Sequence, residues 1–126
     1  MWTQTMMANP LLRLRGSKWR TSFSLSGQDK EYIRGKGLLL IEHECRDIIQ
    51  RRLSNPYNDG SQTPYRGHPV FTAQHATATC CRKCLERWHG ISRWQPLAKS
   101  DCEFVTKMVM KWMRSQLLLA GNSLPA

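Results

Sequence analysis

Apolar residues recur at three- and four-residue steps in two stretches of the chain, and this spacing is typical of helices that bury one face. The first stretch predicts a helix over about residues 37–53, whose apolar stripe consists of Ile41, Cys45, Ile48, Ile49 and Leu53. The second predicts a helix from about residue 100 to residue 120, whose apolar stripe consists of Val105, Met108, Val109, Trp112 and Leu119. The second helix should turn a basic row outward, made of Lys107, Lys111 and Arg114.

Local signals add shorter elements. Asp29 suits the first turn of a helix over about residues 28–34, because acidic side chains favour the positive end of a helix. Ser100 and Glu103 are spaced as a capping box at the start of the last helix. Apolar and polar residues alternate in the segment 17–25, which predicts an extended conformation. Residues 1–16 are predicted to be a loosely held arm.

Residues 54–70 contain three prolines and the triplet Asn58-Asp59-Gly60, which rule out a regular element and indicate successive turns. Tyr57, Tyr65 and Val70 can anchor this segment, so it is predicted to be an ordered loop. The expected fold is therefore mainly α, a small single domain of three to four helices with a long ordered loop. The helical domain should cover residues 17–120, between a flexible basic arm at 1–16 and a tail at 121–126.

The stretch from His75 to Gly90 holds three of the five cysteines and two of the four histidines. One interpretation is a continuous helix over about residues 73–89, capped by Gly90, whose cysteines pack in an apolar stripe. Its opposite face would present a polar row made of His75, Thr79, Arg82, Glu86 and His89. Such groups can bind phosphate or transfer protons, which makes His68, His75, Arg82 and Glu86 the candidate catalytic residues.

The second interpretation is a metal knuckle. A Cys-x-x-Cys turn such as Cys81–Cys84 places two thiolates on one tetrahedral zinc ion, and a His and a fourth ligand complete the set. His89 is the third ligand in this hypothesis, and His75 is preferred as the fourth over His68, Cys80 and Cys45. The helix would have to break near Cys84, because Cys84 and His89 point about 140° apart on a continuous helix.

The charge balance favours an anionic partner. The chain has 19 Lys and Arg against 9 Asp and Glu, a formal net charge of +10, which attracts nucleic acid first. Arg82, Lys83 and Arg87 would also lower the pKa of a neighbouring thiol, so redox chemistry is a third interpretation of the cysteines. Their odd number and tight spacing fit a reducing compartment, and no apolar run approaches the roughly 20 residues of a membrane helix. A cytoplasmic location is expected.

Three runs of residues carry a resemblance to a known family. They are Arg66-Gly67-His68-Pro69-Val70-Phe71, then the run from Gln74 to Cys81, and then Cys84-Leu85 with Trp88-His89. With Asn58-Asp59-Gly60 and Gln62-Thr63-Pro64 in the loop, they resemble a bacterial and phage family known as domain of unknown function 4186, over about residues 17–115. The resemblance implies a small protein of bacterial or prophage origin without an established activity, in which the loop and the central stretch form one site.

The leading hypothesis is a metal-binding, nucleic-acid-associated protein in which Cys81, Cys84, His89 and His75 hold zinc. One alternative is an enzyme that acts on a phosphorylated or nucleic-acid substrate through the His, Arg and Glu side chains of the polar row. Another alternative is a phage accessory protein that binds a host protein through its basic surface.

Overall fold

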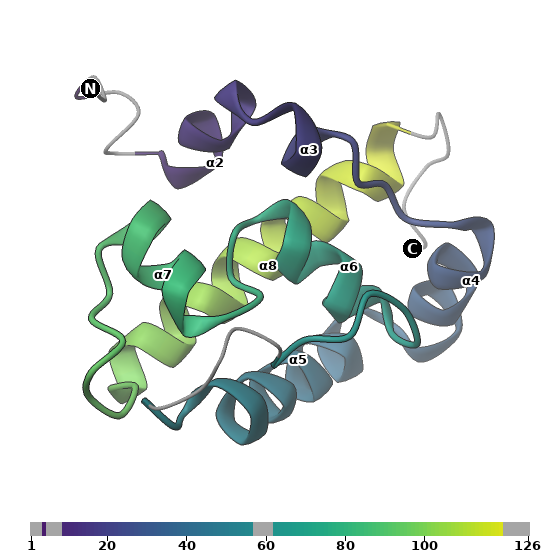
Figure 1. Cartoon of the computed structure of the whole chain (residues 1–126). Helices are drawn as coiled ribbons and strands as arrows, with labels where there is room; N and C mark the ends of the chain where they lie inside the picture. The colour runs from purple at the N-terminus through teal and green to yellow at the C-terminus, as the bar shows by residue number, and fades with distance from the viewer. Residues whose placement is uncertain (1–3, 5–8, 57–61, 120–126) are drawn as a thin grey trace.

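The computed structural model describes residue 4 and residues 9–56 and 62–119. Within these residues the chain forms seven α-helices and one 3-10 helix, and no strand. The helices are α2 (Pro10–Arg13), η1 (Leu14–Gly16), α3 (Lys18–Thr21), α4 (Gly27–Lys36), α5 (Leu38–Leu53), α6 (Pro69–Ala76), α7 (Arg82–His89) and α8 (Lys99–Leu119), shown in Figure 1. The prediction of a mainly α fold is confirmed. The prediction of three to four helices is wrong, because the chain divides into more and shorter helices than its periodicity indicates.

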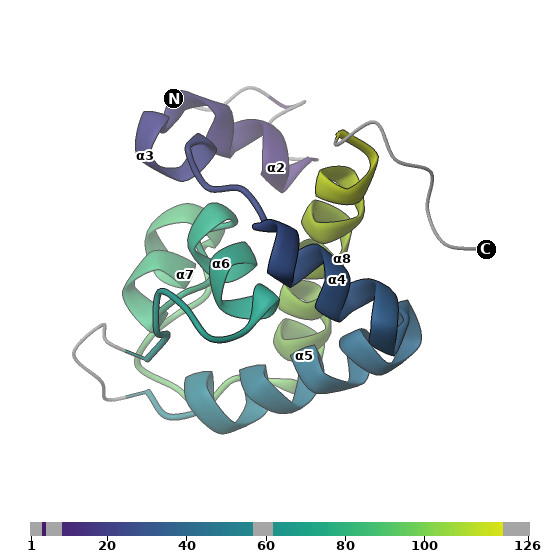
Figure 2. The ribbon, with the colours of Figure 1, turned by 90° about the vertical axis from the view of Figure 1, so that its right-hand side faces the viewer.

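The core lies between α5 and α8, which pack against each other, while α6 packs on α8 and α4 on α5. Figure 1 shows α8 passing behind α6 and α7, and Figure 2 shows α5 and the N-terminal segment on opposite sides of the molecule. The predicted stripe of α5 is fully buried, and Val105 and Val109 of α8 are inaccessible to solvent. Lys107, Lys111 and Arg114 are exposed, as the periodicity predicts. In the described part of the chain, no helix has both the length and the apolar character needed to span a bilayer.

The start of α8 differs from the predicted capping box. The amide nitrogen atoms of Asp101 and Cys102 donate to the carbonyl oxygen of Ala98, so the helix begins before Ser100. Glu103 instead pairs with Arg46 of α5, whose Nε lies 2.6 Å from a carboxylate oxygen of Glu103. This ion pair connects the two longest helices.

Residues 10–16, which were expected to form part of a loosely held arm, are helical and fold onto the body of the protein. Asn9 accepts from the amide of Leu11 at the start of α2, and Ser17 accepts from the amide of Arg20 in α3. These caps favour two four-residue helices, so residues 18–21 are helical and not extended. Because Arg13 and Leu14 are buried, the helical domain begins before residue 17. The predicted tail at 121–126 lies outside the described residues.

The described parts of the predicted loop, residues 54–56 and 62–68, contact the neighbouring helices. The Thr63 hydroxyl donates to the Cys80 carbonyl oxygen at 2.7 Å, and Arg52 of α5 donates to the carbonyl oxygen of Gln62 at 3.2 Å. The Tyr65 ring stacks on His75, with the two ring centroids 4.2 Å apart. Residues 62–65 therefore pack against α6 and the segment that joins it to α7. The predicted anchor Tyr57 lies outside the described residues.

Candidate metal centre

The continuous helix predicted over residues 73–89 is wrong: α6 ends at Ala76, and α7 begins at Arg82. Thr77 turns its hydroxyl back to the carbonyl oxygen of Ala73 at 2.8 Å, the kind of local bond by which threonine competes with helical hydrogen bonding. Ala78 then adopts a left-handed conformation with φ of 59°, which a continuing helix cannot contain. The chain reverses here and delivers the cysteines to the start of α7.

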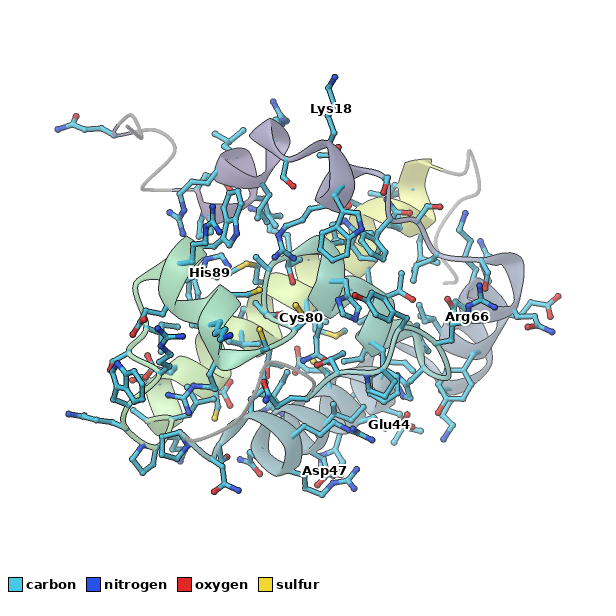
Figure 3. The ribbon with its side chains drawn as sticks, viewed as in Figure 1. Lys18, Glu44, Asp47, Arg66, Cys80 and His89 are labelled. Carbon is cyan, nitrogen blue, oxygen red and sulfur yellow. The ribbon has the colours of Figure 1, made fainter. Side chains whose placement is uncertain are left out.

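Three sulfur atoms meet at this reversal. Cys80, Cys81 and Cys84 place their Sγ atoms within 4.8 Å of one another, and the Sγ atoms of Cys80 and Cys84 are 3.7 Å apart. Cys81 is the N-cap of α7, and its sulfur accepts from the amide of Cys84 at 3.4 Å. Figure 3 shows Cys80 in the middle of the molecule, and Cys84 is the most accessible member of the group. We call these three residues the cysteine cluster.

Hydrogen bonds from two directions hold the backbone of the cluster. Thr63 reaches the Cys80 carbonyl oxygen from the loop, and the side-chain amide of Gln74 donates to the carbonyl oxygen of Thr79 at 3.0 Å. Both bonds are buried. The fold therefore holds the backbone that carries Cys80, at the start of the cluster, through buried hydrogen bonds.

The three thiols differ in acidity. The Cys80 and Cys84 thiols donate to the sulfur of Cys81, and together with nearby backbone amides they lower the pKa of Cys81. The position of Cys81 at a helix N-terminus acts in the same direction, because the helix dipole stabilises negative charge there. The hydrogen bond to Cys81 raises the pKa of Cys80. By contrast, burial raises the pKa of Cys45 to about 12, which fits a packing role for that residue.

Arg20 of α3 supplies a positive charge to the cluster. Its Nη2 donates to the Sγ of Cys84 at 3.1 Å, and its Nη1 donates to the carbonyl oxygen of His75 at 2.7 Å. The guanidinium lies 5.1 Å from the ring centroid of Trp19 and 5.6 Å from that of Trp88, and the residue is 7% exposed. Sequence reasoning missed Arg20, because it lies 64 positions from Cys84 and no local pattern connects the two.

Neither predicted histidine ligand lies with the three sulfur atoms. His89 donates from Nε2 to the carbonyl oxygen of Thr77 at 2.8 Å and accepts at Nδ1 from Arg13 at 3.0 Å, so both of its nitrogen atoms are engaged. Burial lowers the pKa of His89 to about 4. His75 is held between Tyr65 and Phe23, and its Nε2 lies 3.3 Å from the carbonyl oxygen of Pro64. Among the described residues, the group whose possible ligand atoms already lie within 4.8 Å of one another therefore consists of cysteines alone.

Two of the candidate catalytic residues hold other parts of the fold. His68 caps α6 by accepting from the amide of Val70, and its Nε2 donates to Glu44 of α5 at 2.8 Å. Glu86 accepts from the backbone amide of Arg93 at 3.1 Å and forms an ion pair with the Arg93 side chain, whose Nε lies 3.2 Å from the Glu86 carboxylate. No hydrogen bond in the described part of the chain connects these two residues with each other or with His75.

Arg82 makes more hydrogen bonds than the other three candidate catalytic residues. It is 1% exposed, and its guanidinium donates to the carbonyl oxygens of Leu53, Ser54, Ser92 and Gln95 at 3.1, 3.3, 2.6 and 2.6 Å. It thereby joins the end of α5 to the segment between α7 and α8. A guanidinium engaged in this way has no free face for a substrate. The polar row predicted on a single helix is therefore divided among separate structural contacts.

No solved structure matches this chain. The family model described as a domain of unknown function, DUF4186, matches residues 8–114, and these include the cysteine cluster, Arg20 and the described loop residues. The resemblance carried by the motif of the loop and the central stretch is thereby confirmed, and the protein belongs to the DUF4186 family.

Proposed function

We propose that the protein binds a zinc ion through the thiolates of Cys80, Cys81 and Cys84. The separation of the sulfur atoms carries this proposal. Two thiolates on a tetrahedral zinc ion lie about 3.8 Å apart, given a Zn–S bond of about 2.3 Å. The Sγ atoms of Cys80 and Cys84 are already 3.7 Å apart, so an ion can enter with little movement of the backbone.

The charges near the cluster support the same proposal. Three thiolates around a divalent ion carry a net charge of −1, and the Arg20 guanidinium beside Cys84 balances it. A buried site without such a partner would pay a large desolvation cost. Thiolates are soft ligands that select zinc or copper(I) over magnesium or calcium. Zinc is the ion we propose, and copper(I) is the competing outcome of a metal analysis.

Three protein ligands leave a fourth position on zinc. We propose that water or His75 fills it, while His89 stays with Thr77 and Arg13. The Nδ1 atom of His75 is buried and has no hydrogen-bond partner in the described part of the chain. The charge of Cys81 also acts on the His75 ring. If water fills the position, His75→Ala leaves zinc binding unchanged; if His75 fills it, the affinity falls.

The metal content of the purified protein tests this function. The full chain, purified under reducing conditions without chelators, should contain about one zinc per chain by mass spectrometry of the elements. Cobalt(II) added to the metal-free protein should give the charge-transfer and d–d absorption bands of a tetrahedral thiolate site. A folded protein that retains neither zinc nor copper and shows no cobalt band contradicts the proposal.

Cysteine variants locate the site. Cys81→Ser and Cys84→Ser should each abolish the cobalt charge-transfer band. Cys102→Ser is the matched control, because Cys102 is also a buried free thiol but lies on α8 outside the cluster. Loss of the band in all three variants would point to unfolding, and retention in all three would place the metal elsewhere.

Nucleic acid is the second ligand that we propose, on the basis of the net charge of +10. Binding of this kind releases counterions, so the association constant should fall steeply as the salt concentration rises. Anisotropy of a labelled oligonucleotide, measured over a series of salt concentrations, tests this association. The absence of binding at low salt removes it and leaves the zinc proposal intact.

A further inference from the structure

The carboxylates of this protein are confined to part of the chain. All nine Asp and Glu residues fall within residues 29–59 and 86–103, so residues 1–28 and 60–85 contain only basic charges. In the fold, the carboxylates of α5 lie beside basic partners, as in the pairs Glu44–Lys36 at 2.8 Å and Asp47–Arg51 at 2.9 Å. Figure 3 shows Lys18 at the edge of the molecule opposite Glu44 and Asp47.

Four aromatic rings from the two carboxylate-free segments adjoin one another. The Trp19 ring packs edge-on against Phe23 with their centroids 5.0 Å apart, and His75 stacks between Phe23 at 5.6 Å and Tyr65 at 4.2 Å. We call these four residues the aromatic platform. Its two outer members are solvent-accessible, since Trp19 is 49% and Tyr65 61% exposed. Rings that are held in place by neighbours and still exposed can accept further stacking partners without a loss of side-chain entropy.

A cleft opens beside the platform, between the start of α4 and the segment before α6. Its volume is about 620 Å³, which is within the range of ligand sites, roughly 300–1,000 Å³. Phe23, Tyr65 and Arg66 line it together with the polar residues Ser24, Ser26 and Gln28. Asp29 is the one carboxylate among the lining residues that the structure describes. The cleft thus joins aromatic surface, a cation and hydrogen-bonding groups.

We propose that the aromatic platform and this cleft bind single-stranded nucleic acid. Bases stack on the exposed faces of Trp19 and Tyr65, and the neighbouring cations Lys18 and Arg66, both exposed, contact the phosphates. Stacking on aromatic side chains combined with a positive surface is the general way in which proteins hold unpaired strands. This inference rests on the nucleic-acid association proposed above and adds the surface and the type of strand.

The test uses the reduced full chain and a short fluorescein-labelled oligodeoxythymidine, which forms no duplex by itself. Trp19→Ala should weaken binding about 10-fold, the size expected from the loss of one stacked base. Trp94→Ala is the matched control, because Trp94 is 60% exposed and also lies beside an arginine, with the Arg93 guanidinium 5.0 Å from its ring centroid. The control should bind within about twofold of the parent protein. If the two variants bind the oligonucleotide with equal affinity, the proposal that the aromatic platform binds it is wrong.

A second pair of variants keeps the test decisive if Trp19→Ala does not fold. Lys18→Ala/Arg66→Ala changes only exposed side chains and should lower the slope of log K against log salt by about 1.4, or about 0.7 for each phosphate contact. Arg51→Ala/Lys99→Ala removes the same charge from exposed positions of α5 and α8, outside the cleft, and should leave the slope unchanged. If the two double variants have equal slopes, the proposal that Lys18 and Arg66 contact the phosphates is wrong.

The remaining outcomes separate this inference from the proposed function. If the parent protein does not bind the oligonucleotide at low salt, the association and the platform both fail. If it binds and neither platform variant changes the binding, only the platform fails. If a duplex of the same length binds as tightly as the single strand, the assignment to unpaired strands is wrong.

Discussion

Arg82→Met distinguishes a structural role of this guanidinium from the catalytic role that sequence reasoning gave it. Methionine keeps much of the length of the side chain but removes every donor to the four carbonyl oxygens. Two of those bonds, to Ser92 and Gln95, are 2.6 Å long, and a hydrogen bond to a charged group is worth about 1.5–3 kcal/mol. The two longer bonds, to Leu53 and Ser54, contribute less.

The desolvation of the buried guanidinium offsets part of this sum, whereas each carbonyl oxygen that stays buried without a donor costs about 1–3 kcal/mol. We therefore expect Arg82→Met to lower the free energy of unfolding by about 4 kcal/mol. For a urea m-value of about 2 kcal/mol per molar, the unfolding midpoint falls by about 2 M. Circular dichroism at increasing urea concentrations measures this shift.

Arg87→Met is the control, because Arg87 is exposed on the same helix and loses the same charge. Its midpoint should stay within about 0.3 M of the parent protein, as is usual for surface substitutions. If Arg82→Met lowers the free energy of unfolding by less than about 1 kcal/mol, the bonds to the four carbonyl oxygens do not support the fold as we argue.

Three further predictions concern pH and the backbone. Because burial holds the pKa of His89 at about 4, below its unfolded value of about 6.5, its contribution of about 3 kcal/mol is complete above pH 6.5 and is lost as the pH falls towards 4. An NMR titration of the His89 ring that gives a pKa near 6.5 would contradict this. Burial alone would raise the pKa of Glu44, but hydrogen bonds from Lys36, Tyr32 and His68 lower it to about 2; its stabilisation should therefore disappear between about pH 4.5 and 2. Glu44→Gln should lower the free energy of unfolding at pH 7, measured in urea, by about 1 kcal/mol. This value is reduced for solvent screening, because the carboxylate is 25% exposed. The variant should also lose the dependence of stability on pH between about 4.5 and 2. Gly90 ends α7 with φ of 69°, and a methyl group added there would meet no other atom within 4 Å, so Gly90→Ala should cost about 1 kcal/mol from backbone strain alone. Thermal unfolding measures this cost, and an unchanged melting temperature would refute it.

The long helices could be predicted because their signal is local. The stripe of α5 repeats with the period of a helix, and the same residues fill the core, so pattern and packing agree. The break between α6 and α7 has no such signal. Ala78 takes a left-handed conformation without a glycine to indicate it, and the turn depends on hydrogen bonds of Thr77 and Gln74 that form only once the chain has reversed.

The site was predicted only in part for a related reason. The spacing of Cys81 and Cys84 was visible in the sequence, and Cys80 was among the alternatives for a fourth ligand. The partners of the histidines were not visible, because Arg13 lies 76 positions from His89 and Glu44 lies 24 positions from His68. In the sequence these histidines look free to act as ligands or catalysts. In the fold they are engaged by residues that lie far away along the chain.

The three sulfur atoms of the cysteine cluster come from five consecutive positions of the chain, residues 80–84. Ligands that are close in sequence lose little loop-closure entropy when they gather around an ion. If the cluster binds zinc as proposed, the unfolded chain would also hold zinc through these residues, and any affinity of the unfolded state would subtract from the stability that the metal gives to the folded state. Zinc would thus raise the melting temperature only modestly, and it could occupy the cluster while the chain is still folding.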